Sequence, residues 1–145
     1  MRTRCSQAEA WIRGDAENPG LFGKVAFISR KGGTLVTAQI HGLPDSDTGF
    51  FAFHIHEGAD CWGKGFPNTG SHYNPGDSPH PCHAGDLPPL LSCGGDACMS
   101  VVTDRFRVEE ILGRTVVIHS NPDDFRTQPS GDAGNKIACG VICPC

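Results

Sequence analysis

The sequence predicts an all-β protein, a sandwich or barrel of seven or eight short strands. Three observations point to this class. Short apolar, β-rich runs recur between turns. Gly (19) and Pro (11) are abundant among the 145 residues, which favours turns and long ordered loops. No segment shows the periodicity of an amphipathic helix. The length suits one hydrophobic core, so residues 1–145 are expected to form a single domain.

The first strands are expected in the N-terminal third of the chain. Residues 8–13 alternate between apolar and polar side chains, as a half-buried strand does. Residues 21–30 and 34–41 flank a Gly-containing turn at 31–33, which predicts a hairpin. A further strand is predicted over residues 50–56.

The remaining strands are expected at 97–103, at 114–119 and from 136 to 142. They are separated by two long segments rich in Gly and Pro, 57–90 and 120–135. A loop as long as the first of these is expected in a small domain only where it carries function. Three histidines lie in it, and metal ligation would order it.

Composition and charge exclude some classes of partner. The net charge is −4, without a block of like charges, and there is no basic patch of the kind that binds nucleic acid. No apolar run approaches the roughly 20 residues that span a membrane. Residues 1–6 are basic but lack an apolar stretch after them, so they do not form a signal peptide as they stand. Either the protein is cytoplasmic or a leader is missing from the sequence, and the first is the expectation.

Two histidines, His54 and His56, lie two residues apart in the strand predicted over 50–56. Side chains at i and i+2 of a strand point to the same face, so two such imidazoles can chelate one metal ion. A pair of surface histidines explains this pattern equally well.

A denser cluster follows within fifteen residues of the long loop and consists of His72, His80, His83 and Asp86. Neutral imidazoles and a carboxylate suit zinc, and four ligands complete its tetrahedral coordination. The cluster therefore indicates a metal site rather than chance. Taken alone, His119 at the end of an apolar strand is more typical of a core histidine, and His41 is interpreted as a surface residue.

Five segments follow one another in the order of a known family's signatures. They are Phe53–Glu57, His72–Pro75, His83–Leu87, Gly113–His119 and Gly134–Ile142. With these motifs the sequence resembles the copper–zinc superoxide dismutases over about residues 8–142. A single His-x-His motif is a weak signal, whereas five motifs in order are specific. The resemblance implies a Greek-key β-sandwich, a flattened barrel of about eight antiparallel strands with two long functional loops.

The resemblance also implies a role for individual residues. Copper would be held by His54, His56, His72 and His119, and zinc by His72, His80, His83 and Asp86. His72 would then bridge the two metals. Asp123 would accept hydrogen bonds from ligand histidines of both sites and fix their orientation. Cys61 and Cys139 match the pair that forms the family's intrasubunit disulfide.

The implied activity is the dismutation of superoxide to dioxygen and hydrogen peroxide. Copper can cycle by one electron, whereas zinc cannot. His72 is expected to release copper and take up a proton in one half of the cycle and to supply that proton in the other. Superoxide is the expected substrate, and a homodimer is the assembly that is common in the family.

The sequence departs from the family at Lys136, where members normally carry an arginine. A cation beside copper attracts and orients superoxide. Lysine keeps the charge but lacks the planar fork of donors. We therefore expect turnover that is slower than that of an arginine enzyme but not absent. Arg126 is a second candidate for guiding the anion.

The metal loop also differs from the family pattern. Only two residues separate His80 from His83, fewer than in many members, although this spacing can still serve one metal. The segment from His56 to His72 is longer than usual, with residues 62–67 inserted near Cys61. The match of Cys61 is therefore weaker than that of Cys139.

Six further cysteines have no role that the resemblance supplies: Cys5, Cys82, Cys93, Cys98, Cys143 and Cys145. Cys93 and Cys98 bracket a turn, and a disulfide between them requires their strands to pair in register. The terminal Cys143-Pro144-Cys145 either captures copper ions or forms a disordered tail, and the tail is favoured.

Two other functions use the same residues. One is a noncatalytic copper- and zinc-binding protein, since a fold alone does not fix a function. The other is a copper-handling protein that uses the terminal thiols, because soft thiolates prefer Cu(I). The candidate histidine and aspartate ligands form a complete set, and this favours the enzyme.

Overall fold

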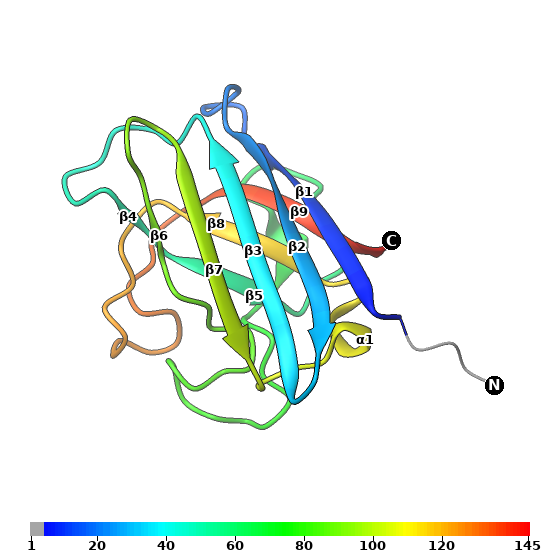
Figure 1. Ribbon diagram of the computed structural model, residues 1–145. Coiled ribbons are helices and arrows are strands. Elements are labelled where there is room, and N and C mark those ends of the chain that lie inside the picture. The colour runs from blue at the N-terminus through cyan, green and yellow to red at the C-terminus, as the bar shows by residue number, and fades with distance from the viewer. Residues whose placement is uncertain (1–4) are drawn as a thin grey trace.

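The structure is a computed structural model that describes residues 5–145, and it is built almost entirely of β-strands (Figure 1). The elements in chain order are β1 (Gln7–Gly14), β2 (Phe22–Arg30), β3 (Gly33–His41), β4 (Phe50–Phe51), β5 (Phe53–His56), η1 (Pro67–Thr69), β6 (Leu90–Leu91), β7 (Ala97–Thr103), α1 (Val108–Ile111), β8 (Thr115–His119) and β9 (Lys136–Pro144). The all-β prediction is confirmed.

Seven strands form one curled antiparallel sheet in the order β5-β8-β9-β1-β2-β3-β7, and β4 pairs with β6. Strands β1, β2, β3 and β7 make the front layer in Figure 1, with β5, β8 and β9 behind them. The chain crosses from β3 to β5 at the far edge of the sheet, and from β7 to β8 beside β5. These crossings and the two layers fit the Greek-key sandwich that the resemblance implied.

The predicted hairpin is confirmed, since β2 pairs with β3 from Phe22 opposite His41 to Arg30 opposite Gly33. The strand predicted over 50–56 is divided at Ala52, whose amide donates to the Asn121 carbonyl instead of a strand neighbour. The helical turn α1 was not predicted, because four residues are too few to show a period. Within residues 5–145 no helix is long and apolar enough to cross a membrane.

The core lies between the two layers and is filled by alternate side chains of the long strands, which include Ile12, Phe27, Ile40, Ile55 and Ile118. Strand β8 is buried along its whole length. Its Ile118 faces this core, whereas Val117 packs against Phe66 and Cys139 in a second, smaller cluster. The rear layer therefore has a second covered face, outside the core.

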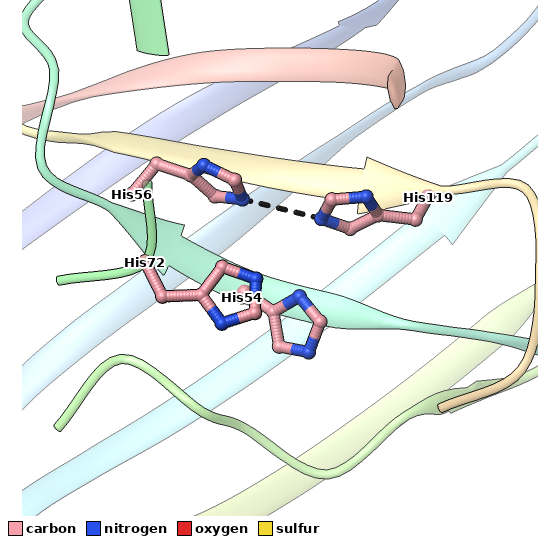
Figure 2. Close-up of side chains that lie close together, drawn as sticks. All are labelled: His54, His56, His72 and His119. Carbon is pink, nitrogen blue, oxygen red and sulfur yellow. Dashed lines mark hydrogen bonds between the residues drawn. The ribbon is translucent and has the colours of Figure 1, made fainter. Parts of the chain in front are cut away.

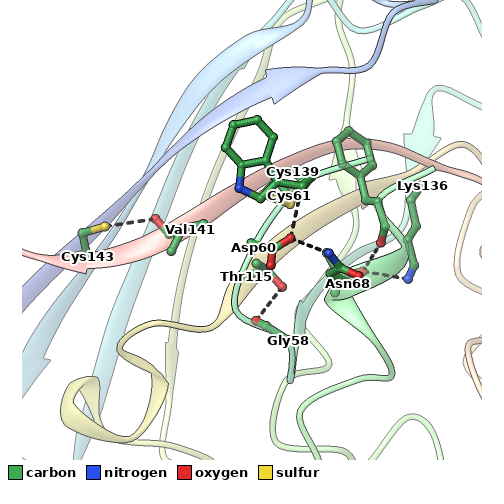
Figure 3. The surroundings of a disulfide bond; sticks show 12 residues. Gly58, Asp60, Cys61, Asn68, Thr115, Lys136, Cys139, Val141 and Cys143 are labelled. Atoms are coloured by element: carbon green, nitrogen blue, oxygen red, sulfur yellow. Dashed lines mark hydrogen bonds between the residues drawn. A yellow bond between two sulfur atoms is a disulfide. The ribbon is translucent and has the colours of Figure 1, made fainter. Parts of the chain in front are cut away.

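The loop after β5 helps to cover that second face and is tied to the sheet by a disulfide between Cys61 and Cys139 (Figure 3). This bond confirms the pairing that the resemblance implied. Cys61 packs beside Val117 and Phe66, so the inserted segment after Cys61 is part of a packed structure. The disulfide fixes the start of the long loop against β9.

The structure tests two interpretations of the other cysteines, the possible disulfide between Cys93 and Cys98 and the disordered chain end. Cys93 lies opposite Asp96, not opposite Cys98, and both thiols are free, so the strands do not pair in the register that a hairpin disulfide needs. The interpretation of the chain end as a disordered tail is wrong. Cys143 and Pro144 belong to β9, where they pair with Glu9 and Ala8, because the sheet continues to the end of β1.

Candidate metal centre

Two of the predicted ligands lie on β5, whose alternation sends them away from the core. Phe53 and Ile55 point into the core, and His54 and His56 point to the opposite face, where they are nevertheless buried. His119 ends β8 after a register shift at Ile118 and is also buried. The outer face of the rear layer is therefore lined with histidine.

His72 joins this group from the long loop, through an isolated bridge that pairs it with His56. Figure 2 shows the four rings together: His72 and His54 lie side by side, and His56 points toward His119. One ligand nitrogen from each of the four rings lies within 4.8 Å of the others. This set has the composition predicted for copper.

The protonation of these rings can be worked out from their contacts. His56 Nδ1 donates to the Gly70 carbonyl at 2.9 Å, which leaves a lone pair on Nε2. That atom lies 3.2 Å from His119 Nε2. Burial, with the charges of neighbouring histidines, lowers the pKa of His56 to about 2 and the pKa of His119 to about 3. Both rings are neutral near neutral pH, and neutral imidazole is the metal-binding form.

A second set of donors lies on the other side of His72. His72 Nδ1 is 2.8 Å from Asp86 Oδ1 and 3.1 Å from His83 Nδ1. The other carboxylate oxygen, Asp86 Oδ2, is 2.9 Å from His80 Nδ1 and 3.2 Å from His83 Nδ1. Three imidazoles thus surround one carboxylate, as predicted for the zinc ligands. The compressed spacing between His80 and His83 suffices because a turn closes it, with the Cys82 amide donating to the Pro79 carbonyl.

Asp123 connects the two sets. Its Oδ2 accepts a hydrogen bond from His54 Nε2 at 2.8 Å, and its Oδ1 accepts one from His80 Nε2 at 2.8 Å. Burial opposes its ionisation, but the hydrogen bonds from His54, His80 and the Phe125 amide outweigh burial and lower the pKa of Asp123 to about 2. A charged carboxylate thus fixes which nitrogen each ring turns toward the metal site. His54 lies within reach of both clusters, but His83 Nδ1 is 3.1 Å from His72 Nδ1 and 3.2 Å from Asp86 Oδ2, so His83 is the better third imidazole beside Asp86.

Sequence comparison identifies relatives of this arrangement. The family model of copper/zinc superoxide dismutase matches residues 21–142. A superoxide dismutase [Cu-Zn] 2 of Aquifex aeolicus is 33% identical over 137 residues, which cover 84% of this chain and 79% of the relative. For a superoxide dismutase [Cu-Zn] of Legionella pneumophila the identity is 34%, with 86% and 79% covered. For superoxide dismutase [Cu-Zn] 3 of Arabidopsis thaliana it is 35%, with 94% and 89% covered.

The chain belongs to the copper/zinc superoxide dismutase family. It is a superoxide dismutase, and its cofactors are copper and zinc. The donor atoms of this dismutase fit both ions. Four buried ring nitrogens make no hydrogen bond within residues 5–145: His54 Nδ1, His72 Nε2, His80 Nδ1 and His119 Nδ1. Such atoms are costly to bury. Cations at the two clusters would satisfy the first three, whose companion nitrogens already have partners. The 2.9 Å separation of His80 Nδ1 from Asp86 Oδ2 is therefore a close approach of two metal donors without hydrogen-bond geometry.

Several residues that support the dismutase site were not found from the sequence. Gln128 holds His80 from both sides, because its Oε1 accepts from the His80 amide at 2.9 Å and its Nε2 donates to the His80 carbonyl at 2.7 Å. Arg105 donates to the Pro81 carbonyl at 2.8 Å. Gly131, with φ of 74°, is required because a Cβ there would lie 2.0 Å from Asp123 Oδ1. These contacts join loops that are far apart in the sequence, so no local spacing of residues predicts them.

Metal-free dismutase is expected to lose stability as the pH falls from about 6.5 toward 3. His56 and His119 have lowered pKa values in the folded chain, so the unfolded chain binds protons first as the pH drops below 6.5. Asp123, whose pKa is also lowered in the folded state, contributes in the same direction at still lower pH. Thermal melts of the metal-free protein between about pH 7 and about pH 4, which spans the titration of an ordinary histidine, measure this loss. A melting temperature that is constant or rises on acidification would contradict it.

Proposed function

We propose that this enzyme dismutes superoxide at a copper ion held by His54, His56, His72 and His119, next to a zinc ion held by His72, His80, His83 and Asp86. One observation carries the proposal. His72 has Nδ1 among the zinc donors, while its Nε2 is buried without a hydrogen-bond partner and the ring belongs to the copper cluster. A ring with its two nitrogens directed to two clusters suits a bridging imidazolate.

Copper, when bound, supplies the one-electron exchange that lets superoxide be oxidised in one half-reaction and reduced in the other. The chain's own part is to move a proton. Nε2 of His72 is the atom that can accept a proton when it is not bound to metal and later give it up toward peroxide. His72 Nδ1, held beside Asp86 and His83, keeps the ring in place while this happens.

Lys136 supplies the positive charge that we propose guides superoxide. Its Nζ donates to Thr69 Oγ1 at 2.7 Å and to the Gly70 carbonyl at 3.2 Å. Figure 3 shows the Lys136 side chain directed toward the loop that carries Asn68. Lys136 pairs with His119 in the sheet, and the Gly70 carbonyl that accepts from its Nζ also accepts from His56 Nδ1. The ammonium therefore lies near the copper donors. Arg126 is exposed, and its main-chain amide donates to Asp124.

Lys136→Met is expected to lower kcat/KM for superoxide roughly tenfold and to weaken its dependence on ionic strength, because the anion loses a steering charge. Lys136→Arg is expected to raise kcat/KM, since guanidinium presents a fixed fork of donors. Stopped-flow decay of superoxide over a range of salt concentrations measures both effects. Lys31→Met, which removes the same charge from the β2–β3 turn, is the matched control. Equal losses in the two methionine variants would contradict a local role for Lys136.

The proposed function is tested by the superoxide decay rate of protein loaded with copper and zinc, measured by stopped flow with metal content determined on the same sample. A rate far above the metal-free protein and the buffer supports the enzyme. No excess rate, with both metals bound, would favour the noncatalytic metal-binding protein.

A further inference from the structure

Four metal-binding side chains gather at a place that the dismutase centre does not use. They are His41 at the end of β3, Cys93 and Asp96 on either side of a tight turn, and Cys98 on β7. We propose that this thiol–histidine cluster is a further metal site, which takes a zinc-type divalent cation through one imidazole, one carboxylate and two thiolates.

The turn that carries Cys93 and Asp96 is held by main-chain contacts. The Cys93 amide donates to the Asp96 carbonyl at 2.8 Å, and the Asp96 amide donates back to the Cys93 carbonyl at 3.1 Å. Gly94 and Gly95 between them have φ of 61° and 95°, which favours glycine at both positions. The Gly95 carbonyl also accepts from the Leu43 amide at 3.0 Å. The cluster therefore has a fixed backbone.

The four side chains share one outer face. Ala97 is buried, so its neighbours Asp96 and Cys98 point outward. Ala97 lies opposite the buried Ile40, and His41 therefore lies across from Asp96 on the same outer face. Cys93 is directly opposite Asp96 on the other side, and residues opposite each other in a sheet share a face. Asp96 thus stands between His41 and Cys93.

His41 is already positioned by two contacts. Its Nδ1 lies 2.9 Å from Asp96 Oδ1, and its ring packs at 5.2 Å from the ring of Phe22. The spacing of this histidine–carboxylate pair matches that of His72 and Asp86, 2.8 Å apart in the dismutase centre. Two groups held this close can serve one cation with little rearrangement.

The four side chains are exposed and line one open pocket on the surface, together with Gln39, Leu91 and Ala97. Both thiols are exposed, so they can change rotamer toward a cation at small cost. One nitrogen, one oxygen and two sulfur donors form a set that tetrahedral zinc accepts. The strand residues of this pocket lie mainly on β3 and β7, in the front layer of Figure 1, whereas the strand-borne ligands of the dismutase centre lie on β5 and β8, in the rear layer.

The donor types give a direct test, because the dismutase centre has only nitrogen and oxygen donors. Reduced holoenzyme, with copper and zinc loaded, is titrated with Co²⁺, and thiolate-to-cobalt charge-transfer absorption is followed in the near ultraviolet. The expected result is one Co²⁺ bound with this absorption, which Zn²⁺ then abolishes. His41→Ala is expected to weaken Co²⁺ binding by at least roughly tenfold, because loss of a residue that only orients a metal ligand already costs roughly 10- to 100-fold.

The paired variants assign the signal. Cys93→Ser with Cys98→Ser is expected to lose the absorption and to keep dismutase activity. The matched control is Cys143→Ser with Cys145→Ser, which removes the two thiols at the end of the chain and is expected to keep the absorption. The inference is overturned if wild-type holoenzyme gives no absorption, if the Cys93/Cys98 variant retains it, or if the Cys143/Cys145 variant alone loses it. The last outcome would mean that the thiols of Cys143 and Cys145 bind the metal instead.

Discussion

His119→Ala is expected to abolish copper-dependent superoxide turnover while zinc stays bound. His119 contributes one of four clustered donors, and its Nε2 faces His56 Nε2 at 3.2 Å. The zinc donors other than His72 lie at Nδ1 of that ring, away from the copper cluster to which His119 belongs. We expect the rate of decay to fall to that of the metal-free protein. Stopped-flow kinetics with copper and zinc determined on the same sample measure this.

Val102→Ala, which shortens an exposed side chain on β7, is the control for effects of protein preparation and metal loading. It should keep the wild-type rate and both metals. The copper assignment fails if His119→Ala retains turnover with copper bound. Loss of zinc together with turnover would instead mean that the two sites do not bind independently.

Asp123→Asn is expected to lower the affinity for zinc roughly 10- to 100-fold, the usual cost of removing a residue that orients metal ligands. The carboxylate accepts from His54 Nε2 and His80 Nε2 at once. An amide has one oxygen and one NH₂ group, so it can accept from one ring only, and its NH₂ faces the N–H of the other. Either His54 or His80 is then no longer held in the tautomer and ring orientation that metal binding requires. Competition with a zinc chelator measures the affinity.

Asp132→Asn is the matched control for this variant. Asp132 is exposed in the same loop, with φ of 56°, a conformation that asparagine accepts. It makes the same chemical change without touching a ligand and should leave zinc affinity unchanged. Equal affinities in the wild type and Asp123→Asn would show that packing alone orients His54 and His80.

Much of the fold could be predicted because strands and turns have recognisable patterns in the local sequence. The β2–β3 hairpin was predicted from two β-rich runs around a Gly-containing turn, and the observed pairing of the two strands confirms it. The candidate ligands were predictable for a similar reason: His54 and His56 share a strand face, and His72, His80, His83 and Asp86 are close in sequence. His119 was recognised only through the resemblance, because its neighbours come from β5 and from a loop.

Contacts between distant segments could not be predicted. The hold of Gln128 on His80 and the anchoring of Lys136 by Thr69 each join residues that are far apart in the chain. His41 is a surface residue, as predicted, but its contact with Asp96 depends on the pairing of β3 with β7. The prediction for the end of the chain was wrong because a strand can continue through a proline where it has a neighbour on one side only. At Pro144, β9 pairs with β1, whereas its pairing with β8 ends at Val141.

The Gly70 carbonyl joins a metal ligand to the guiding cation. The Gly70 oxygen accepts from His56 Nδ1 and from Lys136 Nζ. The same peptide group therefore sets the tautomer of a metal ligand and the place of the guiding charge. A loop transplanted from a relative would alter both at once. Residues 61–70 and position 136 should accordingly be exchanged between family members as one module. In a chimaera that takes them from two different members, the loop carbonyl and the cation at position 136 are expected not to fit each other.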